Sequence, residues 1–383
     1  METIQKLQRL SQDMNLEPDG VKEADCRPVV GNREHDFIPI SEVSMPGGKK
    51  MKVLKTLLTS ACERNCYYCP FRAGRNSLRR TTFKPDELAS IFMQMHQAKL
   101  AEGIFLSSGI IKGGVATQDR LIETAEILRN KYNYRGYLHL KMMPGVEKGQ
   151  VLRSMQLASR VSTNLEAPND KRLATLAPMK QFTAELLQPL KWVEEIRQNQ
   201  PPHTAWNGRW PSTVSQFVVG AAGESDLELL STSEYLYQQT KLKRVYYSAF
   251  RPIPDTPLDG HSPEDPVREH RLYQSSFLLR DYGYSLEEMP FTQAGNLPKD
   301  VDPKLAWAQA NLHEPLEINR AGREQLLRIP GIGPKAATAI LLARRTGKLR
   351  SINDLRRLGI SPKRPLPFIL LDGRRPSHQP ALF

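Results

Sequence analysis

Three cysteines within eight residues constrain this chain more than any other feature. Cys62, Cys66 and Cys69 stand in the stretch CERNCYYC with C-x3-C-x2-C spacing, and only one other cysteine, Cys26, occurs in the 383 residues. The apolar run MKVLKTLLTS, residues 51–60, comes directly before them and predicts a buried strand. The three thiols are therefore expected on a loop at a strand end, where closely spaced thiolates can hold one soft metal centre.

Two kinds of metal centre are compatible with this spacing. A structural zinc site takes four protein ligands, so Cys26 or His35 would have to supply the fourth. A [4Fe–4S] cluster held by three thiolates would leave one iron open for a ligand that is not protein. An open metal position usually marks chemistry rather than scaffolding.

The rest of the sequence indicates where such a centre would work. No run of 18 apolar residues occurs, so no membrane span is expected. The N-terminal stretch METIQKLQRLSQDMN lacks the apolar core and small residues of a secretory signal. Clustered cysteines without an export signal indicate metal binding in a reducing compartment rather than disulfides, and they predict a cytoplasmic protein.

Strand-like and helix-like segments alternate from residue 51 to residue 285. The pattern predicts six strands, each followed by a helical segment, at 51–60, 103–108, 136–142, 159–166, 211–220 and 244–250. Six such units predict a parallel sheet with right-handed crossovers, either doubly wound or closed into part of a barrel. Residues 1–50 are expected to form an N-terminal extension with one short amphipathic helix at 3–14.

The cysteine stretch, with Tyr68 directly before the third cysteine, resembles the signature of radical S-adenosylmethionine (SAM) enzymes. The resemblance implies that Cys62, Cys66 and Cys69 hold a [4Fe–4S] cluster whose open iron binds SAM, with Tyr68 beside the cofactor. Reductive cleavage of SAM would give a 5′-deoxyadenosyl radical that abstracts hydrogen from a substrate, with an electron donor such as flavodoxin or ferredoxin. It also implies an α/β fold with a partial (β/α)6 TIM-like barrel over residues 51–285 and a site at the C-terminal ends of its strands.

Two glycine-containing strand ends match this family. Ser107-Ser108-Gly109 stand where the family commonly has Gly-Gly-Glu against the SAM amino group. The carboxylate is missing here, so serine hydroxyls or main-chain carbonyls would have to accept instead. FVVGAAGESD resembles the family's glycine-rich segment, where Gly220 and Gly223 would let the backbone approach the adenosine closely.

Polar residues also follow the predicted third and fourth strands. In VSTNLEAPND the residues Ser162, Asn164 and Glu166 alternate onto one face, and the resemblance implies that Asn164 or Glu166 binds the ribose hydroxyls. His139 and Lys141 share one face of the third strand. They are candidates for contacts with the SAM carboxylate or the substrate, and packing at the surface is the alternative for both.

The C-terminal part of the chain is strongly basic. After a linker at 286–310, residues 311–383 hold 14 Lys and Arg and 5 Asp and Glu, so they carry +9 of the net charge of +13. Their stretch IPGIGPK, between two helical patterns, closely resembles a helix-hairpin-helix DNA-binding motif and predicts a small all-α domain. Main-chain N–H groups at the hairpin would reach a phosphate, and cations around it would add charge contacts. The candidate DNA contacts are Gly331, Gly333, Lys335, Arg344, Arg345 and Lys348.

A barrel joined to this motif resembles a radical SAM subgroup described as DNA modification or repair proteins. The subgroup implies a double-stranded DNA partner and a uracil-DNA-glycosylase-like protein partner. A radical SAM enzyme acting on tRNA or a small molecule, with the hairpins as an adaptor, is the first alternative. A non-enzymatic DNA-binding protein with a structural cluster is the second, and a protein-binding rather than DNA-binding hairpin also stays open.

Overall fold

The computed structural model describes residues 3–14, 40–44, 50–75 and 79–376. The chain divides into two compact units, Met1–Glu224 with Tyr235–Asp265 and Ser225–Glu234 with Pro266–Phe383. The sequence predicted a barrel at 51–285 and a C-terminal region at 311–383. The structure instead assigns the helix that begins at Pro266 to the second unit, so its boundary lies earlier in the chain. Within the described ranges, no helix is long and apolar enough to cross a membrane.

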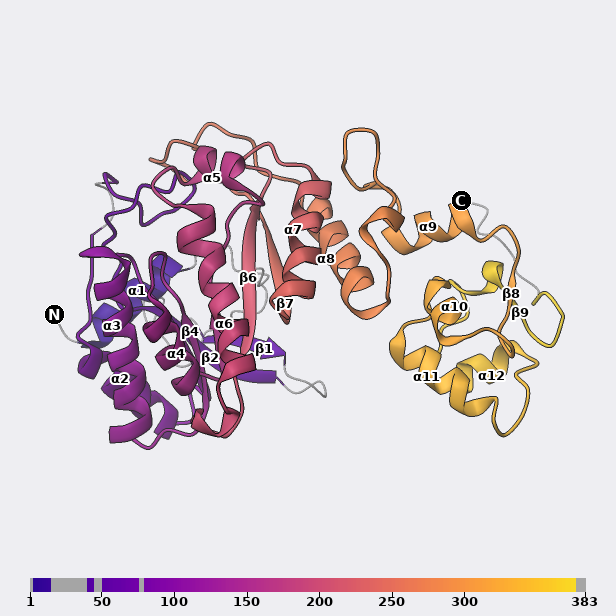
Figure 1. Cartoon of the computed structure of the whole chain (residues 1–383), viewed down its shortest axis with the longest axis horizontal. Helices are drawn as coiled ribbons and strands as arrows, with labels where there is room; N and C mark the ends of the chain where they lie inside the picture. The colour runs from indigo at the N-terminus through magenta and orange to yellow at the C-terminus, as the bar shows by residue number, and fades with distance from the viewer. Residues whose placement is uncertain (1–2, 15–39, 45–49, 76–78, 377–383) are drawn as a thin grey trace, which may run out of the picture. The chain divides into compact units, whose positions relative to one another are not determined.

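One seven-stranded sheet forms the frame of the first unit (Figure 1). Its strands pair in chain order from β1 to β7. The six predicted strands correspond to β2 to β7, which pair in parallel, and β1 adds an unpredicted antiparallel edge. A doubly wound sheet reverses its strand order at one point, so this order agrees with the expected partial barrel. The strands are β1 Ile40–Ser44, β2 Lys50–Leu57, β3 Gly103–Ser107, β4 Tyr137–Lys141, β5 Arg160–Ser162, β6 Ser212–Val219 and β7 Arg244–Ala249.

Helices follow the strands and bury one face of the sheet. On β4, Leu138 and Leu140 are fully buried, whereas Tyr137, His139 and Lys141 on the opposite face are half-buried, as the period of two requires. The predicted N-terminal helix is present. The helices are α1 Thr3–Met14, α2 Pro85–Gln97, α3 Gly113–Glu126 with a π-turn Ile127–Lys131, α4 Lys148–Leu157, α5 Asp170–Leu176, α6 Gln188–Asn199 after a π-turn Phe182–Leu187, and α7 Asp226–Gln239.

The second unit holds short helices around its own apolar core. Ile318, Leu326, Ile332, Ile340 and Leu355 are fully buried in it. The predicted all-α region also contains a two-residue parallel strand pair, β8 Leu316–Glu317 with β9 Ile369–Leu370. The helices are α8 Pro266–Asp281, α9 Pro303–Asn311, α10 Arg323–Arg328, α11 Pro334–Ala343 and α12 Ile352–Arg357, with single 3-10 turns at Leu286–Glu288 and Leu366–Phe368. A further 3-10 turn, Pro202–Thr204, belongs to the first unit.

Candidate functional site

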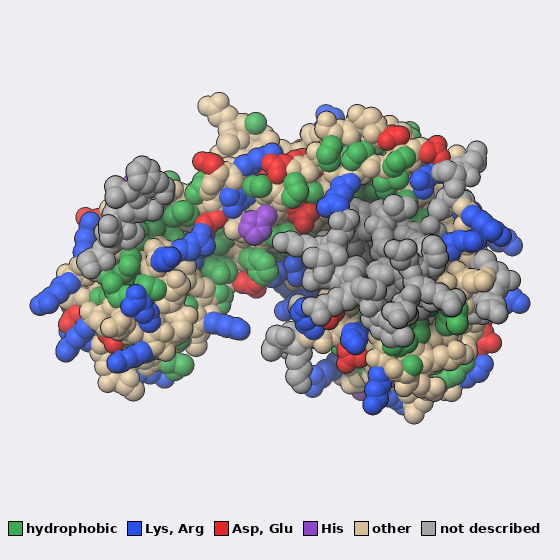
Figure 2. Space-filling view, turned by 180° about the vertical axis from the view of Figure 1, so that it is seen from behind, with side chains coloured by type: hydrophobic (Ala, Val, Ile, Leu, Met, Phe, Trp, Pro, Cys, Tyr) green, Lys and Arg blue, Asp and Glu red, His purple; other side chains and the backbone are tan. Residues whose placement is uncertain are grey.

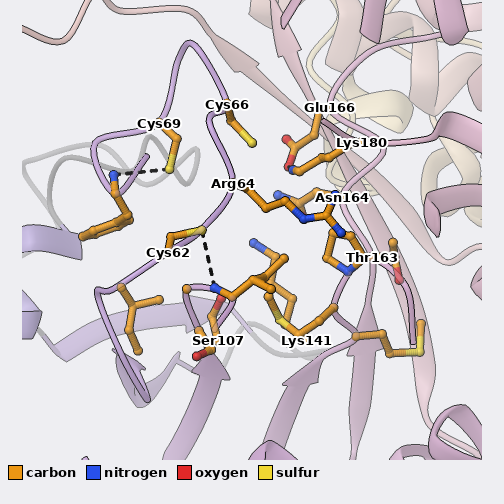
Figure 3. A pocket seen from close by; sticks show the side chains of 18 of the residues that line it. Cys62, Arg64, Cys66, Cys69, Ser107, Lys141, Thr163, Asn164, Glu166 and Lys180 are labelled. Atoms are coloured by element: carbon orange, nitrogen blue, oxygen red, sulfur yellow. Dashed lines mark hydrogen bonds and ion pairs between the residues drawn. The ribbon is translucent and has the colours of Figure 1, made fainter. Parts of the chain in front are cut away.

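A cavity of about 70 Å³ lies at the C-terminal ends of β2 to β5, where the cysteine loop follows β2 (Figure 3). Most of the predicted cofactor residues meet there although they come from four separate stretches of the sequence. The predicted residues that line it are Cys62, Cys66, Tyr68, Cys69, Ser107, Ser108, Gly109, Lys141, Asn164 and Glu166.

The three thiols open onto the same space (Figure 3). The Ile110 N–H donates to Cys62 Sγ and the Phe71 N–H to Cys69 Sγ, each at 3.4 Å. Hydrogen bonds of this kind suit sulfurs that carry negative charge as cluster ligands. Burial raises the pKa of the Cys66 thiol, and the nearby Lys180 ammonium opposes that effect.

The loop that carries the thiols is held by its own neighbours. Arg80 Nη1 donates to the carbonyls of Ser60 at 2.6 Å and Phe71 at 2.8 Å, and Arg80 Nη2 donates to the Arg72 carbonyl at 2.7 Å. Gly109 is required for a close approach, because a Cβ there would lie 2.2 Å from the carbonyl oxygen of Ala61. The end of β3 is thereby fixed directly against the start of the cysteine loop.

These thiols do not meet at a point. Among the described residues, no three His, Cys, Asp or Glu side chains converge closely enough to hold a single metal ion. Cys26 and His35, the possible fourth zinc ligands, lie outside the described residues. Three thiols around a shared space suit a cluster with three protein ligands.

A buried ion pair stands beside the thiols. Lys180 Nζ lies 3.0 Å from Glu166 Oε1, and the two side chains are 9% and 4% exposed. Burial alone would raise the pKa of the Glu166 carboxyl, but the charges of Lys180 and Lys141 leave it below its usual value. Lys180 Nζ is also 3.5 Å from the hydroxyl oxygen of Tyr68. The sequence did not predict Lys180, because it lies in an irregular stretch that matches no motif.

Arg64 connects that stretch to the cysteine loop. It lies between the first two cysteines, donates to the Met179 carbonyl, and pairs with Glu185 at 2.7 Å. The Tyr67 N–H donates to the Leu176 carbonyl at 2.9 Å. The segment after α5 is therefore part of the site, and Arg64 is a second residue that sequence reasoning missed.

Three buried polar atoms at the cavity have no hydrogen-bond partner among the described residues. They are Ser108 Oγ, Thr163 Oγ1 and Glu166 Oε2, and all three residues line the cavity. Buried polar atoms are normally paired, so an unpaired set at one cavity points to a polar ligand that completes them. Hydroxyl, amino and carboxylate groups of SAM have the chemistry to do so, and the thiols and these atoms together fit a cluster with SAM.

Three predicted cofactor residues are not brought to the cavity. Ser162 instead shares a hydrogen bond with His139, Oγ to Nε2 at 2.9 Å. Gly220 has φ +93° and faces the Glu264 carboxylate, which a Cβ at Gly220 would strike at 2.3 Å. Glu224 accepts from the N–H groups of Gly220 and Ala222. Gly220 and Gly223 therefore lie outside this cavity, and their approach to adenosine stays a prediction.

The turn between α10 and α11 carries the predicted DNA contacts. Gly331 is exposed with φ +83°, as a tight hairpin requires. Gly333 is partly covered, because a Cβ there would lie 2.9 Å from Tyr282 Oη. Lys304 Nζ donates to the Ile332 carbonyl at 2.6 Å. The stretch GIGPK at 331–335 recurs as GISPK at 359–363, in a turn after α12, and residues of both stretches line a groove of about 930 Å³.

The four predicted cations of this region differ in their exposure and in their contacts with other residues. Lys335 and Arg345 are exposed. Arg344 donates to the carbonyls of Ile318 and Ala321 and so braces the domain, and Lys348 pairs with Asp372 at 2.7 Å. Figure 2 shows Lys and Arg side chains spread over the C-terminal unit rather than gathered in one patch.

Comparison with known proteins gives distant similarity only. No protein-family model and no curated protein matches the sequence. The chain is similar to the solved structure of methylornithine synthase, with a TM-score of 0.46 and 15% identity over 60% of this chain and 61% of that one. For the FeFe-hydrogenase maturase HydG from Carboxydothermus hydrogenoformans, the TM-score is 0.46 and the identity 15%, over 60% of this chain and 51% of that one. For a radical SAM methyltransferase from Sphaerobacter thermophilus, the TM-score is 0.44 and the identity 13%, over 70% of this chain and 81% of that one.

The chain thus spans less than two thirds of the first two of these proteins.

Proposed function

We propose that the chain is a radical SAM enzyme that acts on nucleic acid. The observation that carries the proposal is one cavity that combines three thiols in C-x3-C-x2-C spacing with three unpaired buried polar atoms. A [4Fe–4S] cluster with SAM supplies reductive cleavage of the sulfonium and hence a carbon radical for hydrogen abstraction. The proposal requires a one-electron donor such as flavodoxin or ferredoxin.

Each group at the cavity has a role under this proposal. Cys62, Cys66 and Cys69 would hold the cluster. Glu166 Oε2 is an acceptor for a ribose hydroxyl, and Lys180 keeps that carboxylate charged and oriented. The Lys141 ammonium suits the SAM carboxylate, and Ser108 and Thr163 offer hydroxyls to its polar groups. Burial of these side chains excludes water and strengthens each charge contact.

The basic C-terminal unit supports a nucleic-acid substrate, with double-stranded DNA as the first choice. The hairpin before α11 and a turn of similar sequence after α12 border one groove, and a glycine with positive φ begins each, Gly331 and Gly359. Backbone N–H groups at a helix N-terminus such as that of α11 bind phosphates without reading sequence. A role in DNA modification or repair, and a uracil-DNA-glycosylase-like partner, are part of the same proposal.

Anaerobic reconstitution with iron and sulfide, followed by reduction in the presence of SAM, tests the enzymatic half. The full chain should bind about four irons and release 5′-deoxyadenosine and methionine. One zinc and no sulfide per chain would instead support the structural zinc knuckle. A reduced cluster that leaves SAM intact would support a DNA-binding protein with a structural cluster.

The salt dependence of DNA binding tests the proposed DNA contacts. In the full chain, the logarithm of the DNA association constant should fall with log salt by about 0.9 per phosphate neutralised. Lys335→Ala should weaken all duplex sequences alike and reduce the slope by about one contact. The exposed Lys171→Ala in the first unit serves as the matched control. If Lys335→Ala leaves the DNA affinity and the slope unchanged, the hairpin is better explained as a protein-binding element, or the substrate is a tRNA bound outside the hairpin.

A further inference from the structure

One row of side chains crosses the face of the half-barrel sheet that carries the cavity. In the strand registers, Lys55 pairs with Phe105, Phe105 with His139, His139 with Arg160, and Arg160 with Ser212. Partners on neighbouring parallel strands point to the same side of the sheet, so these five side chains lie next to one another. We call Lys55, Phe105, His139, Arg160 and Ser212 the floor row.

The floor row lies one step along the strands from the cysteine cavity. Leu57, Ser107 and Lys141, each two residues after a member of the row on its own strand, line that cavity. Side chains two residues apart on a strand share a face and are separated by about 7 Å. A group resting on the floor row is therefore adjacent to the site where the proposed chemistry starts.

This region of the sheet has an excess of positive charge. Arg160 Nε donates to Ser212 Oγ at 3.0 Å, which uses one of its five N–H groups. Neither Arg160 nor Lys141 forms an ion pair with a described residue, although both are half-buried. Burial lowers the pKa of His139 far below its usual value, and Arg160, Lys141 and Lys55 lower it further. A half-buried cation such as Arg160, which pairs with no described carboxylate, is stabilised when an anion joins it.

Flat rings stand between these cations. The Phe105 and His139 rings lie 4.6 Å apart, centroid to centroid, and the Tyr137 ring is 6.5 Å from His139. The hydrogen bond from His139 Nε2 to Ser162 Oγ, at 2.9 Å, holds the imidazole in place. Aromatic faces beside guanidinium and ammonium groups are the combination that binds bases and phosphates of single-stranded nucleic acid.

We infer that the floor row is the substrate subsite and that it takes one nucleotide, with the phosphate at Arg160 and the base against Phe105 and His139. The inference rests on the proposed function and narrows its substrate class. A base that is stacked and paired in a duplex cannot reach these rings. A nucleotide of duplex DNA would therefore have to leave the helix to be modified.

Equilibrium dialysis of the iron-loaded full chain, with SAM present, tests this inference. The probes are the four deoxynucleoside 5′-monophosphates and the matching nucleosides. At least one monophosphate should bind about tenfold more tightly than its nucleoside, which is the effect of about 1.4 kcal/mol. Arg160→Gln should remove this difference, and Phe105→Leu should weaken the nucleotide and the nucleoside alike. Arg135→Gln, an exposed cation just before β4, should change neither.

The outcomes separate the inference from the function on which it rests. SAM affinity, measured on the same samples, shows that each variant is folded and loaded. If SAM binds but monophosphates and nucleosides bind equally in the unaltered chain and in Arg160→Gln, the subsite is wrong and the proposed function stands. If the unaltered chain does not bind SAM, the proposed function falls and the inference falls with it. Competition by a short single-stranded oligonucleotide assigns the subsite to a nucleotide of a chain, and lack of competition assigns it to a free nucleotide.

Discussion

Replacing Cys66 by alanine is expected to remove the iron–sulfur cluster and with it all cleavage of SAM. Cys66 is the buried member of the three thiols and lines the cavity beside Lys180. With two thiolates left, too few protein ligands remain for a cluster that already has one open iron. Iron and sulfide analysis, together with the visible absorption of the reconstituted protein, measures the loss.

Cys62→Ala and Cys69→Ala should behave in the same way, because both thiols open onto the same space. Cys26→Ala is the matched control and should keep the full iron content and activity. Retention of cleavage in Cys66→Ala would contradict the assignment of the three cysteines. Loss of the cluster in Cys26→Ala would show that a fourth thiol takes part.

Lys180→Met is expected to reduce both stability and SAM affinity. Removing one partner of a buried pair leaves the Glu166 carboxylate without its counter-charge, which typically costs about 3–5 kcal/mol. Without the Lys180 charge, burial favours the neutral Glu166 carboxyl, so the hydrogen bond from the SAM ribose to it loses its charge assistance. That loss typically costs about 1.5–3 kcal/mol, a tenfold or greater fall in affinity. Thermal unfolding and SAM titration measure the two effects separately.

Two further variants make this test specific. Lys148→Met breaks an exposed pair with Glu195 and should change stability by about 1 kcal/mol or less. The double variant Lys180→Met with Glu166→Gln removes both charges, so it should recover stability without recovering SAM affinity. Normal SAM affinity in the double variant would place the pair in the scaffold rather than in the cofactor site.

Much of the first unit could be predicted because its signals are local. Period-two and helical patterns predicted β2 to β7 in order, and the cysteine spacing predicted the loop after β2. Gly109 was expected beside the cofactor, and the structure adds a steric reason, its contact with the Ala61 carbonyl. β1 was missed because residues 1–50 show no clear alternation.

Strand length explains why Ser162 does not line the cavity. The sequence predicted one extended strand over 159–166, which would place Ser162, Asn164 and Glu166 on a single face. β5 ends at Ser162, and Glu166 has φ +65°, so the chain has left the extended conformation by then. Ser162 consequently faces His139 on the sheet, while Asn164 and Glu166 turn to the cavity.

Local sequence patterns could not predict contacts between segments that are far apart in the chain. Arg64 meets Glu185 across 121 residues, and nothing in either neighbourhood marks the pair. Arg344 could not be distinguished from the free cations, because its carbonyl partners come from another part of the domain.

Transfer of deuterium from labelled DNA to 5′-deoxyadenosine tests whether the protein abstracts hydrogen from DNA. The reduced, iron-loaded full chain is incubated with SAM and with DNA deuterated on its bases and sugars, and the 5′-deoxyadenosine is analysed by mass spectrometry. Our account predicts deuterium in 5′-deoxyadenosine from the labelled DNA, and none from the Cys66→Ala protein. Formation of 5′-deoxyadenosine that never acquires deuterium from any DNA would contradict a DNA substrate, and its complete absence would contradict radical SAM chemistry.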